Sequence, residues 1–145
     1  MSTLPERVEV DFMLLADRAE VLNGKLYMMG GAWDRRYIND INAPVGLSIV
    51  IGVLVPWNLT NEPHSLDIRI DDEDGNTIPP GAKATLNVGR PVQATKGQSF
   101  RATAVINNRW RFPRLGAYSL VASIAGQEAK RVTFYAVEAR TSATA

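Results

Sequence analysis

The chain has 145 residues, no cysteine, and 16 basic against 15 acidic side chains, which gives a formal net charge of +1. This length fits one domain with a core large enough to fold without staples, and the lack of cysteine excludes disulfide frameworks and thiolate zinc sites. The balanced charge excludes a strong overall field that would steer nucleic acid or an anionic membrane to the protein.

Acidic residues interrupt the apolar run near the N-terminus, at Glu9, Asp11 and Asp17. A secretory signal needs an uninterrupted apolar region, and a membrane-spanning helix needs about 20 consecutive apolar residues. We therefore expect a cytoplasmic protein without membrane contact.

The first expected strand runs from Val8 to Asp17, where apolar residues recur with a period of two. We assign its two faces as Val8, Val10, Phe12, Leu14 and Ala16 on one side and Glu9, Asp11, Met13, Leu15 and Asp17 on the other. Asn23-Gly24 then separates two apolar runs and predicts a type I′ hairpin, because both central residues of that turn need positive φ. Residues 35–44 are expected to form a loop.

The strongest strand signal lies at Val45–Val55, where six aliphatic residues occupy every second position. The alternate positions, from Gly46 to Leu54, are small or apolar, which favours a central strand over an exposed edge. This second face leaves one question open, namely whether a loop of the same chain or another copy of the chain covers it.

Shorter alternating segments follow at 66–70, 82–88, 100–106, 116–124 and 131–137, with turn residues between them. No apolar pattern holds a helical period for three turns. About eight short strands predict an all-β fold, an antiparallel immunoglobulin-like β-sandwich, with an open β-barrel as the alternative. We expect one domain at 8–137, preceded by an arm at 1–7 and followed by a disordered tail at 138–145.

Two resemblances support this fold. Leu115-Gly116-Ala117-Tyr118, followed by a hairpin into Arg131–Phe134, looks like the last two strands of immunoglobulin-like sandwiches, and its Gly-x-Tyr start is similar to their tyrosine corner. Most of the chain resembles an uncharacterised bacterial family of small β domains of unknown function. The matching stretches are Leu14–Asp17, Asn23–Tyr27, Gly30–Trp33, Val55–Trp57 with Asn61, Asp72–Gly75 and the Gly-x-Tyr hairpin. That family implies a fold and no activity.

Two features invite catalytic or metal chemistry. The acidic run Asp71–Asp74 has the carboxylates that Ca²⁺ prefers, yet its spacing does not fit an EF-hand, so we favour a solvated turn and assign no metal. His64 is the only histidine, and no Gly-x-Ser-x-Gly elbow or Gly-rich phosphate loop accompanies it. We therefore expect an exposed or capping histidine, no cofactor and no enzymatic activity.

The most distinctive candidate surface combines tryptophan with arginine, residue types that are enriched at protein interfaces. If successive strands alternate in direction, the connections after Met29 and Ile106 lie at one end of the sandwich, together with the acidic turn. The candidate interaction surface is Trp33, Arg35, Arg36, Tyr37, Arg109, Trp110 and Arg111. A structural end-cap with mutual salt bridges is the alternative.

From these features we expect a non-enzymatic structural or adaptor domain that acts through contacts with a protein partner or with itself, as a homo-oligomer. Its support is an apolar second face, formed by Val50 with Leu54, Met13 with Leu15, and Val121, that exceeds what one sandwich covers. A module that binds a glycan or small ligand through Trp/Arg-rich loops is the alternative. No nucleic-acid partner is expected.

Overall fold

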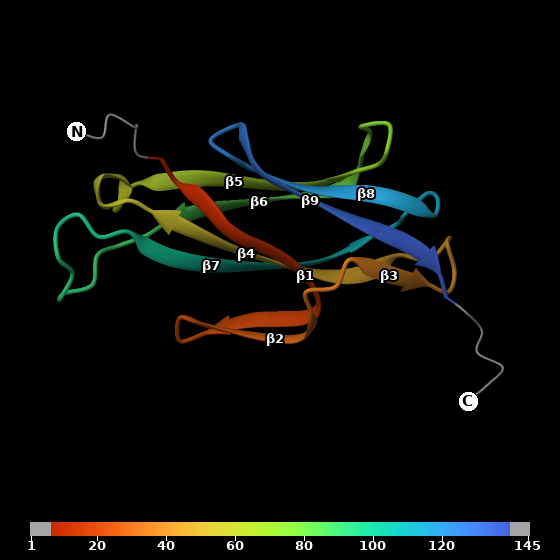
Figure 1. Ribbon diagram of the computed structural model, residues 1–145, viewed down its shortest axis with the longest axis horizontal. Coiled ribbons are helices and arrows are strands. Elements are labelled where there is room, and N and C mark those ends of the chain that lie inside the picture. Colours follow the sequence, from red (N-terminus) through yellow and green to blue (C-terminus); the bar gives the residue numbers. More distant parts are fainter. Residues whose placement is uncertain (1–6, 140–145) are drawn as a thin grey trace.

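The computed structural model describes residues 7–139, and within that range it is an all-β structure of nine strands with one 3₁₀ turn, η1, at Trp57–Leu59 (Figure 1). The strands are β1 (Glu9–Leu22), β2 (Lys25–Gly31), β3 (Arg35–Ile38), β4 (Val45–Val55), β5 (Pro63–Asp71), β6 (Thr77–Asn87), β7 (Phe100–Trp110), β8 (Gly116–Ile124) and β9 (Gln127–Glu138). No helix in the described part of the chain is long and apolar enough to cross a membrane.

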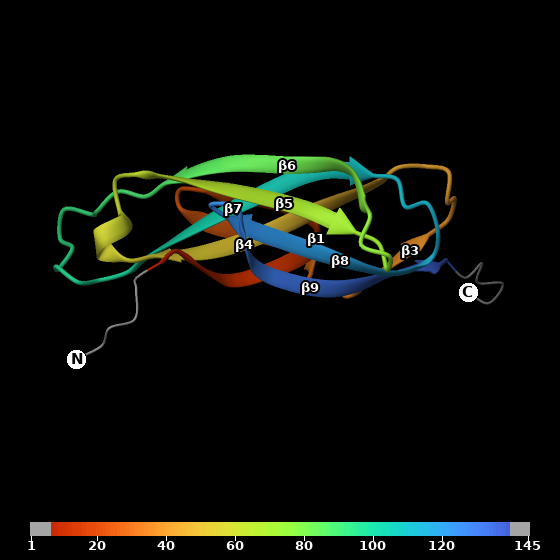
Figure 2. The same cartoon turned by 90° about the horizontal axis from the view of Figure 1, so that it is seen from above.

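The strands form two sheets that pack face to face as a sandwich (Figures 1 and 2). A four-stranded sheet has the order β2-β1-β4-β7 and a five-stranded sheet has the order β3-β9-β8-β5-β6. β4 lies between β1 and β7, as the sequence predicts, and one of its faces is buried in the main core from Leu47 to Val55, with Ile49 and Ile51 at 0% exposure. The expected sandwich is therefore confirmed. The extent of the terminal arms stays a prediction, because residues 1–6 and 140–145 lie outside the described residues.

β1 contains an irregularity that corrects the predicted faces of the first strand. The register with β4 shifts between Val10 and Phe12, as a β-bulge does. A bulge adds one residue and therefore reverses which positions face inward. Val8 and Val10 contact the main core before the bulge, whereas Met13 and Leu15 contact it afterwards. Strict alternation along one strand cannot show such a change.

The sequence predicts a loop over residues 35–44, and this prediction is wrong for the first part of the segment. The strand β3 occupies Arg35–Ile38. It pairs parallel with β9, so that Arg35 lies opposite Tyr135 and Ile38 opposite Glu138. The sandwich is consequently not purely antiparallel and has nine strands where about eight are expected. Four residues are too few for a recognisable period, and the partner strand is distant in sequence.

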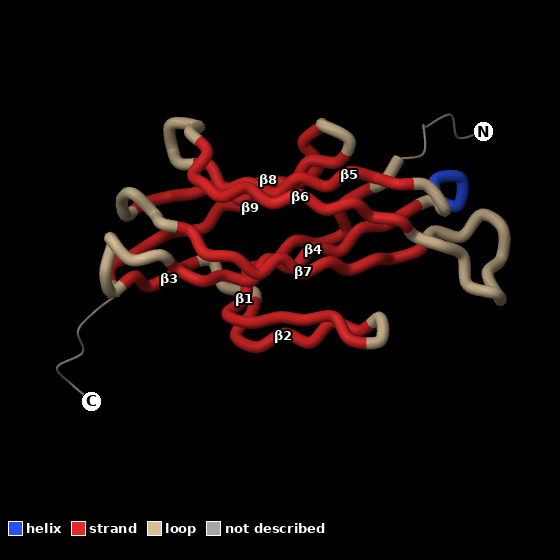
Figure 3. The backbone as a smooth tube through the Cα atoms, turned by 180° about the vertical axis from the view of Figure 1, so that it is seen from behind, coloured by secondary structure: helices blue, strands red, loops and turns tan. Residues whose placement is uncertain are grey.

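The outer face of β4 is covered by the chain's own first hairpin, which lies beneath β4 and β7 (Figure 3). β1 pairs with β4 only as far as Ala16, and from Arg18 to Leu22 it pairs with β2 alone. Ala16, Ala19 and Val50 form a second buried cluster, and partly buried Phe12, Leu14, Leu26, Met28 and Val105 pack against it. A hairpin of the same chain therefore covers the apolar face that the sequence leaves unexplained.

The structure buries four of the five residues on which the expected self-association rests, and Leu54 is partly buried. Met13 and Leu15 lie in the main core at 4% and 2% exposure, and Val50 and Val121 are fully buried. Val121 lies on the outer face of the five-stranded sheet, directly between its cross-strand neighbours Arg69 and Arg131. Long arginine stems cover apolar surface while their charged ends stay in water. A single chain accounts for the burial of all four residues.

Candidate functional site

Trp110 is the clearest correction to the predicted Trp/Arg surface. Its side chain is 0% exposed and belongs to the main core. Its indole Nε1 donates a hydrogen bond of 2.7 Å to the backbone oxygen of Pro80. The cause is strand alternation, because Arg109 and Arg111 point outward on either side of the inward Trp110. Trp110 is a structural anchor between β7 and β6.

The first half of the predicted surface is held against β9 and β1. Arg35 lies over the ring of Tyr135 at 5.3 Å, and Arg36 lies over the ring of Trp33 at 6.0 Å. Arg36 also forms a 3.2 Å ion pair with Asp17. Tyr37 is 61% exposed. Within residues 7–139, no hydrogen bond, ion pair or ring contact joins these residues to Arg109 or Arg111.

The acidic turn does lie at the expected end, where the connection between β7 and β8 also lies (Figure 1). Its salt-bridge partner is Arg114, which lies outside the seven residues of the candidate surface: Arg114 Nη2 lies 2.7 Å from Asp74 and 3.8 Å from Asp72. The hydrogen bond to Asp74 raises the pKa of Arg114. These ion pairs hold the acidic turn to the connection between β7 and β8.

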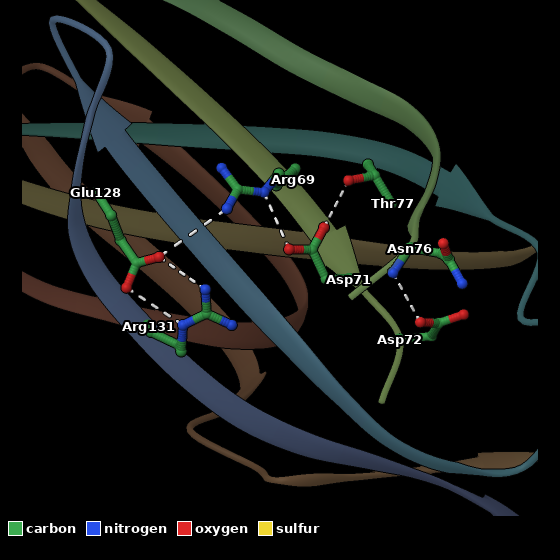
Figure 4. Close-up of polar contacts among 7 residues, drawn as sticks. All are labelled: Arg69, Asp71, Asp72, Asn76, Thr77, Glu128 and Arg131. Carbon is green, nitrogen blue, oxygen red and sulfur yellow. Dashed lines mark hydrogen bonds and ion pairs between the residues drawn. The ribbon is translucent and has the colours of Figure 1, made fainter. Parts of the chain in front are cut away.

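Every carboxylate of the acidic turn has a protein partner, and Figure 4 shows those of Asp71 and Asp72. Asp71 accepts hydrogen bonds from Arg69 and Thr77. Asp72 accepts two backbone hydrogen bonds, and the one from Asn76 is the main cause that lowers the pKa of Asp72. In residues 7–139 no group of three or more His, Cys, Asp or Glu side chains is placed to hold a metal ion.

Glu73 and Tyr118 tie the same end to the start of β8. Glu73 accepts a 2.9 Å hydrogen bond from the backbone nitrogen of Ala117. The hydroxyl of Tyr118 donates a 2.6 Å hydrogen bond to the backbone oxygen of Arg114, four residues earlier, which is the contact expected of a tyrosine corner. Burial raises the pKa of Tyr118. The wider immunoglobulin-like resemblance of this hairpin stays a prediction.

His64 bonds through ring Nε2 to the backbone oxygen of Leu59 at 2.7 Å. An imidazole nitrogen that contacts a carbonyl oxygen must carry the hydrogen, so the second nitrogen is the acceptor in the neutral ring. Arg90 fixes the same connection, because its guanidinium lies 3.8 Å from the centre of the Trp57 ring and donates to the backbone oxygen of Trp57. These contacts hold the residues around η1 in place.

An open groove of about 800 Å³ lies where the first hairpin meets β4 and β7. The hairpin contributes Asp17 to Glu20, Tyr27 and Met29, and the sheet contributes residues 46–48 and 107–109. Arg109 is therefore the one predicted residue that lines it. A side-chain carbon added at Gly46 would meet nothing within 4 Å, so the groove is open above this glycine.

Polar and apolar groups alternate around the groove. Ser48 donates a hydrogen bond to the side-chain oxygen of Asn107 across β4 and β7. Arg18 and Glu20 lie opposite Met29 and Tyr27 in the β1–β2 register. Sequence reasoning missed this groove because it depends on the fold-back of β1 near Ala16. The only available signal is the pair of large side chains two positions apart after the Asn-Gly turn, at Tyr27 and Met29.

Comparison with known proteins identifies one family whose model matches residues 11–137. That span includes every strand except the first residues of β1 and the last residue of β9. The family is described only as a family of unknown function. No curated protein matches the chain.

Proposed function

The chain belongs to DUF6941, a family of unknown function, and we propose that it is a non-enzymatic adaptor domain that contacts a protein partner through its first hairpin. The contact surface, called the hairpin surface below, consists of Arg18, Glu20, Tyr27 and Met29. One observation carries the proposal: Tyr27 and Met29 are 53% and 72% exposed on one face of β2. Tyrosine, methionine and arginine are enriched in protein interfaces, and a polar rim is typical of them.

The hairpin is held in place by its opposite face, so Tyr27 and Met29 are not needed to attach it to the sheet. Leu26 and Met28 pack against the cluster around Val50 and hold the hairpin in place. Tyr27 and Met29 occupy the intervening positions, which point away from that cluster because side chains alternate along a strand. Large side chains that are exposed on one face of a hairpin, while its other face is packed, are typical of a protein contact site.

Affinity capture with two baits tests the proposal. The test bait carries Tyr27→Ser and Met29→Ser, and the control bait carries Tyr37→Ser, a change at an equally exposed tyrosine on β3. We expect the test bait to lose a partner about tenfold or more, because buried aromatic anchors dominate interface free energy. Circular dichroism confirms that both baits fold. A partner that both baits retain equally contradicts the proposal.

The groove supports a second candidate, a glycan or small-ligand module, because its sheet side carries Ser48, Asn107, Asn108 and Arg109 as hydrogen-bonding groups. Arg109 is the residue that this groove shares with the Trp/Arg-rich loops of the sequence-based hypothesis, and Trp110→Ala is no test because that residue is buried. Gly46→Phe places a large side chain at the groove, where the added β-carbon would meet nothing within 4 Å. Titration of oligosaccharides and small ligands, followed by amide chemical shifts, should perturb residues 46–48 and 107–109 in the wild type and not in Gly46→Phe.

A further inference from the structure

We infer that the partner of the hairpin surface is a second copy of this chain, and that two copies pair antiparallel along the outer edges of their β2 strands. The inference rests on the proposed function of the hairpin surface and names its partner. β2 is the last strand of its sheet, so one row of its backbone donors and acceptors has no strand beside it among the described residues. Such an edge is a template for pairing with another chain.

The two edges of the five-stranded sheet carry features that discourage pairing. β6 contains Pro79 and Pro80, which cannot donate to a ladder, and an exposed Lys83. β3 is only four residues long and carries Arg35 and Arg36. Proline, charge and short length are the devices by which proteins protect sheet edges.

The remaining free edges of the four-stranded sheet are also protected. β7 lies in contact with β6 across the open side of the sandwich, where Trp110 donates to Pro80. The part of β1 beyond Ala16 carries Asp17, Arg18 and Glu20. β2 differs from all of these, because Lys25 is its only charged residue and stands at its first position. Among the strands of residues 7–139, β2 is therefore the least protected edge up to Met29, since Gly30 leaves the extended conformation with a φ of 58°.

The sequence of β2 is complementary to itself when two copies run antiparallel about a two-fold axis at Met28. In that register Tyr27 of one copy lies opposite Met29 of the other, which places a thioether beside an aromatic ring. Lys25 lies opposite Gly31, so no like charges face each other. A C2 interface requires this kind of self-complementarity, in which one patch meets the same patch on its copy.

The neighbouring strand extends the complementarity. Glu20 lies opposite Tyr27, and Arg18 lies opposite Met29, within one chain. Across the proposed interface, each row of side chains therefore crosses four strands. It begins with Glu20 and Tyr27 of one copy and ends with Met29 and Arg18 of the second copy. The two rows carry opposite charges at opposite ends, which fixes the antiparallel direction.

Sedimentation velocity on paired charge variants tests the inference with the full chain. One variant carries Tyr27→Lys with Met29→Lys, and the other carries Tyr27→Glu with Met29→Glu. Each variant alone places like charges opposite each other and should weaken self-association at least tenfold, whereas an equimolar mixture should restore the dimer. Tyr37→Lys is the matched control and should sediment as the wild type does.

Crosslinking tests the register, since the chain has no cysteine of its own. A mixture of Tyr27→Cys and Met29→Cys chains should crosslink faster with a short dithiol-reactive reagent than either chain alone. A wild-type chain that is monomeric from micromolar to millimolar concentration overturns the inference, and so does a dimer that survives in both charge variants. Either result leaves the proposed function to the affinity-capture experiment. That function is supported if the bait with Tyr27→Ser and Met29→Ser no longer captures another protein. It is contradicted if this bait captures the same proteins as the wild type.

Discussion

Two hairpins of this domain are built on the same kind of turn and end in different surroundings. Asn23 and Gly24 connect β1 to β2 with φ values of 50° and 72°, and Ala125 and Gly126 connect β8 to β9 with values of 51° and 82°. The second hairpin is held on both edges, by β5 beside β8 and β3 beside β9. The first hairpin beyond Ala16 has no strand on either edge and rests on one face only.

The comparison separates what a turn determines from what its neighbours determine. Both turns fix an antiparallel register through two residues with positive φ. Whether the resulting edge is used inside the chain depends on strands far away in sequence. An isolated two-stranded ribbon is marginally stable in water unless it packs on something else. The first hairpin meets this requirement through Leu26 and Met28, and its edge stays available.

The largest expected difference between the hairpins is the effect of removing one aromatic side chain on the free energy of unfolding. Phe134 in β9 is fully buried and lies 5.9 Å from the rings of both Phe112 and Tyr118. Phe134→Ala should lower the free energy of unfolding by about 3–5 kcal/mol, because it leaves a cavity. The matched change Tyr27→Ala in β2 should stay within about 0.5 kcal/mol, as exposed substitutions do. Urea denaturation measures both, and equal losses would remove the contrast.

A smaller effect should loosen the first hairpin selectively. A side-chain carbon at Gly52 would overlap the edge of the Phe12 ring, which packs against the cluster beneath the hairpin. Gly52→Ala should cost about 1–3 kcal/mol through overpacking. Amide hydrogen exchange should speed up in β2 and not in β8–β9.

Phe12→Leu combined with Gly52→Ala tests the cause of that loss. The smaller side chain frees the space, so the double variant should recover part of the lost stability, as contacting residues are not additive. A double variant that equals the sum of the single changes would contradict the proposed contact.

Exchanging the turn residues should give opposite signs at the two hairpins. An alanine in the left-handed region costs roughly 1–2 kcal/mol, whereas asparagine adopts it readily. Ala125→Asn should therefore raise the free energy of unfolding by roughly 0.5–1 kcal/mol, and Asn23→Ala should lower it by a similar amount. Thermal denaturation measures both changes. If both substitutions changed the melting temperature in the same direction, the two turns would not share the same requirement for positive φ at their first residue.

The smallest expected effect is pH dependence at the second hairpin. The hydrogen bond from Arg131 lowers the pKa of Glu128 below its usual 4.5. A carboxylate with a lowered folded pKa stabilises the protein above the unfolded value, and this contribution disappears as pH falls below about 4.5 through the folded value. Glu128→Gln should make the melting temperature less sensitive to acid in that window. The side chain is exposed, so the change is modest, and coinciding melting curves for the two proteins would contradict it.

The strands that alternate regularly could be predicted from the sequence. Val45–Val55 is found with its predicted bounds, because six aliphatic residues with a period of two define both a strand and its buried face. The face of β1 was wrong after Val10, since one bulged residue reverses every later position and leaves no mark in composition. β3 could not be predicted, because it has four residues and its one sheet partner within residues 7–139, β9, is distant in sequence.

The candidate site was less predictable than the fold. Strand parity placed the acidic turn and the connection after β7 at one end, and the Arg114 ion pairs confirm that neighbourhood. Parity could not show that Trp110 turns inward while Arg109 turns outward, because this depends on which face of β7 meets β6. The groove beside Tyr27 depends on the bend of β1 near Ala16, a long-range packing result that alternation does not encode.

The parallel pairing of β3 with β9 has a consequence for the order in which the chain is made. Arg35 and its partner Tyr135 are 100 positions apart. At ribosomal rates of about 5–20 residues per second, β3 leaves the ribosome about 5–20 s before its only strand neighbour in the described chain. The five-stranded sheet is therefore completed by its last strand, β9, which inserts between β8 and β3. A nascent chain that stalls before β9 carries an unpaired strand, and premature termination there leaves β3 without the pairing that it has in the finished protein.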